Sequence, residues 1–280
     1  MAIASEKKVE LNSNKKQIKK HPKRQGLRKT LILISFLLFP IVFYYLSPML
    51  PLQGGALDQT IVGSLLVFAG MFILSLFLGR AFCGWICPAG GLQEIVMNLK
   101  KNNRKIKAKT FFIKWIIWIP WFTFVLINPF VLGTGISKVD FFYQTSEKGF
   151  VSLSAYTSAG EAAGLDQSYI VYYIVVGLIL ILALVVGKRS FCHHVCWMAP
   201  FMILGRWLSN LLRIPSLGLQ ANKDSCIQCH RCDNECPMSL PVEKMALSGK
   251  IEHRECILCG TCADVCPKGV ISYTFKSYKK

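Results

Sequence analysis

The sequence predicts a helical integral membrane protein with four transmembrane helices, arranged as two repeated hairpins, and a small α+β domain at its C-terminal end. Hydrophobic residues make up 52% of the 280 residues and charged residues only 17%. The apolar residues gather in four long blocks, and about 20 apolar residues in a helix are enough to cross a bilayer. The twelve cysteines form four regularly spaced groups, and the last two groups define the C-terminal domain.

Residues 1–29 are polar and rich in lysine, without an apolar period, which predicts a disordered cytoplasmic arm. The first predicted span is Leu31–Leu46, in which Pro40 is expected to kink the helix. A basic segment before an apolar run is also typical of a signal peptide. The length of the arm and the poor cleavage site near Gly54 favour an uncleaved helix instead.

The three other predicted spans are Ile61–Gly79, Phe111–Leu132 and Tyr169–Gly187. Lysine and arginine residues gather beside the apolar blocks, whereas the loop 133–168 between the third and fourth spans carries few. This is the positive-inside pattern, so we expect a multi-pass protein of the cytoplasmic (inner) membrane with both termini in the cytoplasm. The formal net charge of +18 is then explained by topology and membrane lipid, and no nucleic-acid partner is expected.

Each predicted hairpin ends in basic residues, expected to anchor it at the inner surface, and continues into a Phe-Cys-x3-Cys motif. The two copies contain Arg80, Cys83 and Cys87, and Lys188, Arg189, Cys192 and Cys196. Lys114, at the start of the third span, is expected to reach the same surface. Residues 30–215 therefore form the predicted membrane domain, which includes both motifs and an interfacial helix near residues 201–212.

Two matched cysteine runs dominate residues 216–280. They read Cys226-x2-Cys229-x2-Cys232-x3-Cys236-Pro237 and Cys256-x2-Cys259-x2-Cys262-x3-Cys266-Pro267. This spacing is typical of two [4Fe–4S] clusters, in which the fourth cysteine of each run ligates the other cluster. The predicted ligands are Cys226, Cys229, Cys232 and Cys266 for cluster 1, and Cys256, Cys259, Cys262 and Cys236 for cluster 2. The segment is thus predicted to be a bacterial-type two-cluster ferredoxin-like domain.

Two other readings of these runs are weaker. Zinc sites use two Cys-x2-Cys pairs for each metal, whereas here eight cysteines form two quartets, each followed by proline. Residues 226–230 also match the C-x-x-C-H haem pattern. Haem attachment would remove two ligands from the first cluster, and covalent haem belongs outside the cytoplasm.

The Cys-x3-Cys pairs, Cys83 with Cys87 and Cys192 with Cys196, have i,i+4 spacing, which puts both thiols of a pair on one helix face. Four thiolates from the repeat are expected to converge. The options are a third iron–sulfur centre, copper or another thiophilic metal, a redox-active dithiol, or helix-end packing. His193 and His194 lie between the second pair of cysteines. They are expected to serve either as ligands or proton carriers for a quinol site, or as polar caps at a membrane boundary.

The run Phe82–Gly90, followed by Gln93-Glu94, resembles the NapH/NosR/CcoG-type membrane polyferredoxins, and the order of elements is most similar to NapH. The resemblance covers residues 60–270. It implies passage of electrons between quinols, cytoplasmic donors and periplasmic or membrane acceptors, and its CcoG branch implies copper reduction. The second motif departs from the pattern at Cys196–Pro200, where the proline is displaced, and loop 133–168 is too short for the outer domain of NosR.

The predicted function is electron transfer by single electrons between a cytoplasmic or quinol pool and a membrane or periplasmic redox partner. The alternative is a metal-handling assembly factor that reduces copper or another thiophilic metal at the Cys-x3-Cys pairs. Because the chain has no nucleotide fingerprint and no nucleophile–base pair, we expect a subunit of an oxidoreductase system rather than a stand-alone enzyme. A transporter is less favoured, because no span carries an acidic residue.

Overall fold

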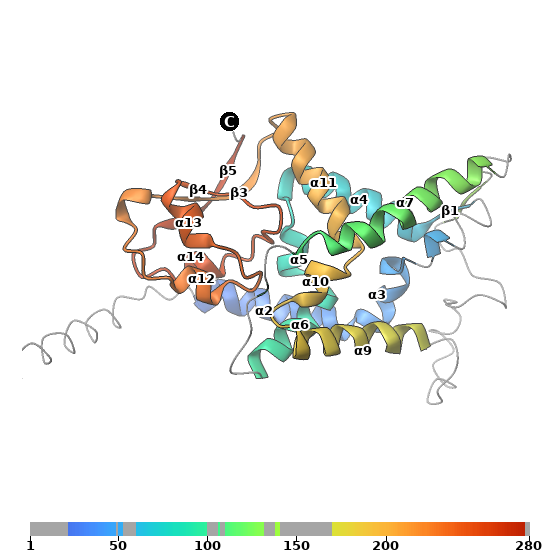
Figure 1. Cartoon of the computed structure of the whole chain (residues 1–280), viewed down its shortest axis with the longest axis horizontal. Coiled ribbons are helices and arrows are strands. Elements are labelled where there is room, and N and C mark those ends of the chain that lie inside the picture. The colour runs from blue at the N-terminus through green and yellow to red at the C-terminus, as the bar shows by residue number, and fades with distance from the viewer. Residues whose placement is uncertain are drawn as a thin grey trace, which may run out of the picture.

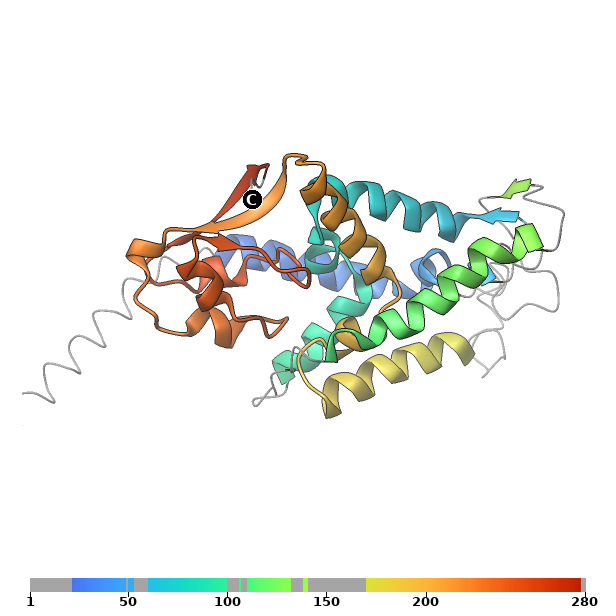
Figure 2. The same ribbon diagram turned by 45° about the horizontal axis from the view of Figure 1, so that its top comes forward.

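A computed structural model of the chain describes residues 22–48, 50–52, 60–99, 106, 110–131, 138–140 and 170–277. These residues form a helical part and a C-terminal part with a small sheet, which lies at one end of the molecule (Figures 1 and 2). Residues 1–21 of the predicted arm and most of loop 133–168 lie outside the described residues. Residues 22–29 of that arm are helical.

The helical part contains nine described helices and a two-stranded parallel sheet. The helices are α2 (Pro22–Leu37), α3 (Phe39–Leu46), α4 (Gly63–Leu78), α5 (Ala81–Trp85), α6 (Pro88–Leu99), α7 (Ile113–Val131), α9 (Ile170–Val185), α10 (Ser190–His194) and α11 (Met198–Leu211). The sheet pairs β1 (Thr60–Val62) with β2 (Lys138–Asp140).

The repeat appears as two copies of one unit, α4–α5–α6 and α9–α10–α11. In each copy a long helix is followed by a short one that carries the first cysteine, and the second cysteine precedes the next helix. The copies are intertwined, because α11 packs along α4 and α6 packs along α9. The first of these contacts is close: a Cβ on Gly205 would lie 2.7 Å from the carbonyl oxygen of Phe72.

The prediction of four transmembrane helices is wrong for this structure. Within the described ranges, no helix combines the length and the apolar character needed to cross a bilayer. Helices α4 and α9 have 16 residues each, or about 24 Å at the usual rise, whereas a hydrocarbon core is about 30 Å thick. The first predicted span is divided between α2 and α3, and Ile61 of the second belongs to strand β1.

The C-terminal part is built on an antiparallel sheet in the order β4-β3-β5, with β3 (Ser216–Ala221), β4 (Lys250–Ile251) and β5 (Ile271–Lys276). The short helices of this part are α12 (Arg231–Glu235), α13 (Val242–Leu247) and α14 (Thr261–Asp264), together with the 3-10 turn η4 (Lys223–Ser225). Helices α13 and α14 contact the sheet, and α12 packs on both of them. Arg206 of α11 fixes the junction of the two parts, because its Nη1 donates to Ser216 Oγ at 2.6 Å and to the Leu217 carbonyl at 3.0 Å.

Candidate functional site

The two C-terminal cysteine runs adopt matching backbones. Gln228 and His230 in the first run, and Leu258 and Gly260 in the second, have positive φ angles of 51°, 55°, 50° and 72°. These are the second and fourth positions after the first cysteine of each run. A left-handed residue turns the chain sharply, so each run curls back on itself and presents its cysteines to one space.

Quartet 1, defined as Cys226, Cys229, Cys232 and Cys266, lines one small cavity. Three of its members come from the first run and Cys266 comes from the second. Cys229 is exposed, and the neighbouring Ile227 is 52% exposed. Quartet 1 is therefore the solvent-facing end of the cysteine system.

Quartet 2, defined as Cys256, Cys259, Cys262 and Cys236, lies deeper. Burial, and then the nearby Cys259, Cys256 and Cys236, raise the pKa of the Cys262 thiol. Burial, and then Cys259 and Cys256, raise the pKa of Cys236 to about 12. Repulsion of this kind acts between nearby groups, so the thiols of quartet 2 lie near one another, and Cys236 is the one that comes from the first run.

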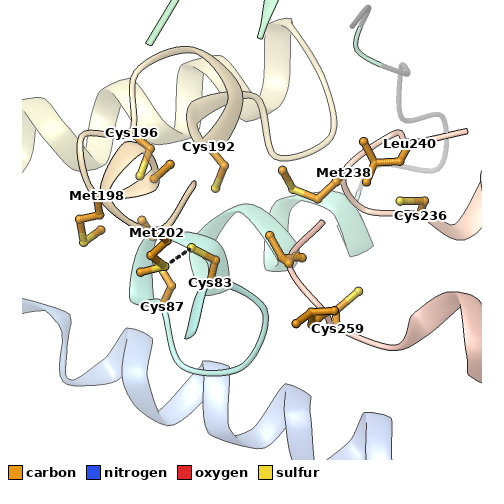
Figure 3. Close-up of a cluster of buried hydrophobic side chains, with 14 of the residues drawn as sticks. Cys83, Cys87, Cys192, Cys196, Met198, Met202, Cys236, Met238, Leu240 and Cys259 are labelled. Atoms are coloured by element: carbon orange, nitrogen blue, oxygen red, sulfur yellow. Dashed lines mark hydrogen bonds between the residues drawn. The ribbon is translucent and has the colours of Figure 1, made fainter. Parts of the chain in front are cut away.

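The inner quartet, defined as Cys83, Cys87, Cys192 and Cys196, forms where the two repeat copies meet. All four are buried, with exposed fractions of 3–5%, and Figure 3 shows them facing a common region from two segments of chain. Burial, followed by the charges of the other three cysteines, raises the pKa of Cys87. Cys83 Sγ lies 3.5 Å from Met202 Sδ, and Gln93 Nε2 donates to Cys192 Sγ at 3.3 Å.

The inner quartet touches the loop of quartet 2. Gly84, directly after Cys83, lies so close to this loop that an added Cβ would be 2.2 Å from the Ile257 carbonyl oxygen and 3.3 Å from the Cys259 nitrogen. Trp85 Nε1 donates to the Leu258 carbonyl at 3.1 Å. The segment that carries Cys83 and Cys87 of the inner quartet is therefore in direct contact with the loop of quartet 2.

Two ion-pair networks flank the inner quartet. Arg80, three residues before Cys83, binds Glu255 Oε2 at 2.7 Å, and Lys114 Nζ binds both oxygens of Glu255 at 2.5 and 2.6 Å. These three side chains are at most 1% exposed. Burial alone would raise the pKa of Glu255, but Arg80 and Lys114 lower it to about 2.

The second network repeats this arrangement around Glu94. Arg189, three residues before Cys192, binds Glu94 Oε2 at 2.7 Å and donates to the Cys83 carbonyl at 2.8 Å. Arg28 of α2 binds the same carboxylate, and its Nη1 lies 3.0 Å from Oε2. Arg80, Arg189 and Lys114 are therefore buried partners of carboxylates, and the prediction that they serve as surface anchors is wrong.

These networks leave positive charge uncompensated near the thiols. Among the described residues, they contain four buried cations, Arg28, Arg80, Lys114 and Arg189, and two carboxylates, an excess of two positive charges. Nε and Nη2 of Arg80 and Nε of Arg189 find no hydrogen-bond partner in the described part of the chain. Buried charge and buried donors are costly unless paired. Four thiolates that hold an anionic metal cluster would supply both the charge and the acceptors, so the residues fit such a group.

His193 and His194 have different surroundings. His193 is fully buried, stacks on Phe111 with ring centroids 4.2 Å apart, and lies 4.0 Å from Glu255 Oε2. Burial lowers its pKa to about 3, which keeps the ring neutral. The ring of His194 lies 2.7 Å from the Ser190 carbonyl and 3.0 Å from Thr110 Oγ1. His194 therefore fits the role of a polar cap.

No sequence pattern predicts a role for Glu94 or Glu255 in the site. Their partners Arg189 and Arg80 are 95 and 175 residues away along the chain, so no local pattern reveals the pairing. The only available signal was the position of each acid: Glu255 directly precedes Cys256, and Glu94 lies within the run used for the family resemblance.

Glu94 makes stability depend on acidity. Burial opposes its charge, but Arg189 and Arg28 lower its pKa from 4.5 to about 2. Because the folded pKa is below the unfolded one, the stabilisation is present above pH 4.5 and is lost as the pH falls toward 2, to a total of about 3 kcal/mol. We expect unfolding followed by tryptophan fluorescence to show this loss, and Glu94→Gln to weaken the pH dependence. An equally steep dependence in the variant would contradict the assignment.

Two families match the chain. A family described as "4Fe-4S binding domain" matches residues 60–107 and 169–215, which contain the inner quartet, and one described as "4Fe-4S dicluster domain" matches residues 225–271. The chain therefore binds iron–sulfur clusters, as the cysteine spacing predicts. The copper alternative gains no support from these families.

Several proteins are similar over most of the chain. An uncharacterized protein of Methanocaldococcus jannaschii is 27% identical over 265 residues, which covers 90% of this chain and 88% of that one. The putative electron transport protein YccM of Escherichia coli K12 is 24% identical over 77% of this chain and 57% of its own. The ferredoxin-type protein NapH of the same organism is 23% identical over 70% and 62%. No solved structure matches the chain.

Proposed function

The chain belongs to the NapH-like family of ferredoxin-type proteins, and we propose that it passes single electrons along three adjacent iron–sulfur centres between redox partner proteins. The centres are assigned to quartet 1, quartet 2 and the inner quartet. An iron–sulfur electron-transfer role follows from the family; the third centre and the order of the three are the proposal.

The charge balance around the inner quartet carries the proposal. A [4Fe–4S] centre held by four thiolates is an anion of about two negative charges, and its net charge and hydrogen bonds govern its potential. The excess of two buried positive charges and the unpartnered nitrogen atoms of Arg80 and Arg189 complement such an anion. A pair of neutral dithiols would leave that excess unpaired in a buried site, which is costly. The dithiol alternative is therefore not favoured.

The protein contributes position and shielding. Iron–sulfur centres supply one-electron chemistry, and the chain determines where each of them lies. The inner quartet is buried, so the surrounding protein shields it from water. The contact of Gly84 with Ile257 places this site next to quartet 2. Cys266 and Cys236 cross between the two C-terminal runs, so that quartets 1 and 2 share their loops.

The exposed end of this series is quartet 1, where Cys229 and Ile227 reach the surface. Exchange of electrons with a soluble redox protein is proposed at this end, because exposed cluster ligands shorten the distance to a docked partner. Quinone, lipid and the cytoplasmic location of this domain stay predictions from the sequence.

Iron and sulfide quantification with EPR spectroscopy tests the proposal. The anaerobically purified chain is expected to contain about twelve irons, four for each centre. A variant with Cys83, Cys87, Cys192 and Cys196 all replaced by serine is expected to contain about eight and to lose one EPR signal. A matched variant with Cys226, Cys229 and Cys232 replaced by serine should instead lose quartet 1 and keep the inner signal.

The outcomes separate the parts of the proposal. About eight irons in both the parent and the inner-quartet variant would exclude a third centre. Far fewer than eight irons in the parent, under protection from oxygen, would overturn the assignment of the two C-terminal clusters.

A further inference from the structure

The repeat places an arginine at the same position in both copies, three residues before the first cysteine of the motif. Arg80 directly precedes α5, which carries Cys83, and Arg189 directly precedes α10, which carries Cys192. Both are buried, with exposed fractions of 2% and 0%. We propose that Arg80 and Arg189 are counter-charge residues that set the reduction potential of the centre held by the inner quartet. This inference rests on the proposed function.

Both guanidinium groups act on the inner quartet at short range. Arg189 Nη1 donates to the carbonyl of Cys83 at 2.8 Å, although the two residues belong to different copies of the repeat. Arg80 lies three residues before Cys83 in the same segment and binds Glu255, which directly precedes Cys256. Both cations therefore lie beside the segment that carries Cys83.

Each arginine keeps N–H donors that its carboxylate does not use. Nη1 of Arg80 forms an ion pair with Glu255, and Nη2 of Arg189 forms an ion pair with Glu94. Nε and Nη2 of Arg80 and Nε of Arg189 have no partner among the described residues. Each carboxylate is shared with a second cation, Lys114 or Arg28, so neither arginine is neutralised within its own pair.

The sign of the effect follows from the charge change. Reduction adds one electron, and therefore one negative charge, to the centre. A buried cation stabilises the reduced form more than the oxidised form, because Coulomb energies are large where water is excluded. Removal of an arginine should lower the potential, whereas removal of the charge of Glu94 should raise it.

A purely structural role predicts a different result. If the arginines only hold segments together, loss of an arginine and loss of its carboxylate disturb the same contact. Both variants would then perturb the centre in the same direction. Opposite signs are the signature of an electrostatic role.

The test is an EPR-monitored redox titration of the purified full-length chain. Arg80→Gln and Arg189→Gln are each expected to lower the reduction equilibrium constant of the inner centre at least about tenfold, or 59 mV for one electron. Glu94→Gln is expected to shift it in the opposite direction. Arg213→Gln, which removes an exposed charge two residues after the end of α11, is the control and should leave the potential unchanged.

Lysine variants cover the case in which a glutamine variant does not assemble. Arg80→Lys and Arg189→Lys keep the charge and should keep the potential close to that of the parent. Potentials of the glutamine variants equal to that of the control, with about twelve irons retained, would overturn the inference but not the proposed function. Shifts of one sign in both the arginine and the Glu94 variants would also overturn it. About eight irons in the parent would instead remove the third centre from the proposed function.

Discussion

Gly84→Ala is expected to push the inner quartet and the quartet 2 loop apart. The new Cβ would lie 2.2 Å from the carbonyl oxygen of Ile257 and 3.3 Å from the nitrogen of Cys259. Both contacts are with backbone atoms, which cannot rotate away as the end of a side chain can. One of the two segments must therefore move, at a cost of about 1–3 kcal/mol for overpacking a buried site.

The displacement should be visible in the spectra as well as in stability. Two reduced centres that lie close together couple magnetically, and the coupling weakens as they separate. We expect Gly84→Ala to keep its iron but to show weaker coupling between the inner centre and the quartet 2 centre. Anaerobic denaturant unfolding should show the loss of stability.

Gly177→Ala is the matched control. Gly177 is also a helical glycine, but a Cβ at this position meets nothing within 4 Å. Alanine is favoured over glycine within a helix by about 1 kcal/mol, so this variant should be as stable as the parent or more stable. Unchanged coupling and stability in Gly84→Ala would show that the contact between the two segments is not tight.

The cysteine chemistry could be predicted from the sequence because it is local. The four cysteines from Cys226 to Cys236 lie within eleven residues, so a short loop can present them as cluster ligands, and the spacing alone predicts iron–sulfur chemistry. The repeat identifies the inner quartet in the same way: equal spacing in two copies indicates that Cys83 and Cys192 occupy equivalent positions. The families that match these segments support iron–sulfur clusters as the cofactor.

The extent of the helices could not be predicted from apolar counts. An apolar residue such as Ile61 can belong to a strand as well as to a helix, and Ile61 lies in strand β1. Gly187 lies beyond the end of α9, although it closed the fourth predicted span. A window of about 20 apolar residues counts such residues as helical, which is why four spans were expected and 16-residue helices were found at two of them.

The buried ion pairs could not be predicted from the sequence, for a different reason. Lysine and arginine beside an apolar block usually mark a surface boundary, and Arg80 and Arg189 fit that pattern. Their carboxylate partners are far away in the sequence, so only the folded arrangement shows that they are buried. Arg80 and Arg189 are therefore part of the candidate site and not anchors at a membrane surface.

Glu255→Gln is expected to destabilise the chain by about 3–5 kcal/mol, the usual cost of removing one partner from a buried ion pair. Glu255 is fully buried and is the carboxylate that Arg80 and Lys114 share. The variant leaves both cations without a carboxylate at the contact between α5, α7 and the quartet 2 loop. Anaerobic denaturant unfolding, followed by tryptophan fluorescence, measures the change.

A second substitution separates charge from shape. Glu255→Gln combined with Lys114→Met removes one charge of each sign, so the excess of positive charge returns to its original value. We expect the double variant to recover part of the lost stability, with an interaction energy of about 0.5–3 kcal/mol in the cycle. Glu252→Gln, in the same segment but with a side chain 30% exposed and paired with Lys250 at 3.7 Å, should cost less than about 1 kcal/mol. A double variant that is less stable than the sum of the two single changes would show that Glu255 holds the segments by hydrogen bonds rather than by charge. The balance of buried charges would then have no role in positioning the inner centre.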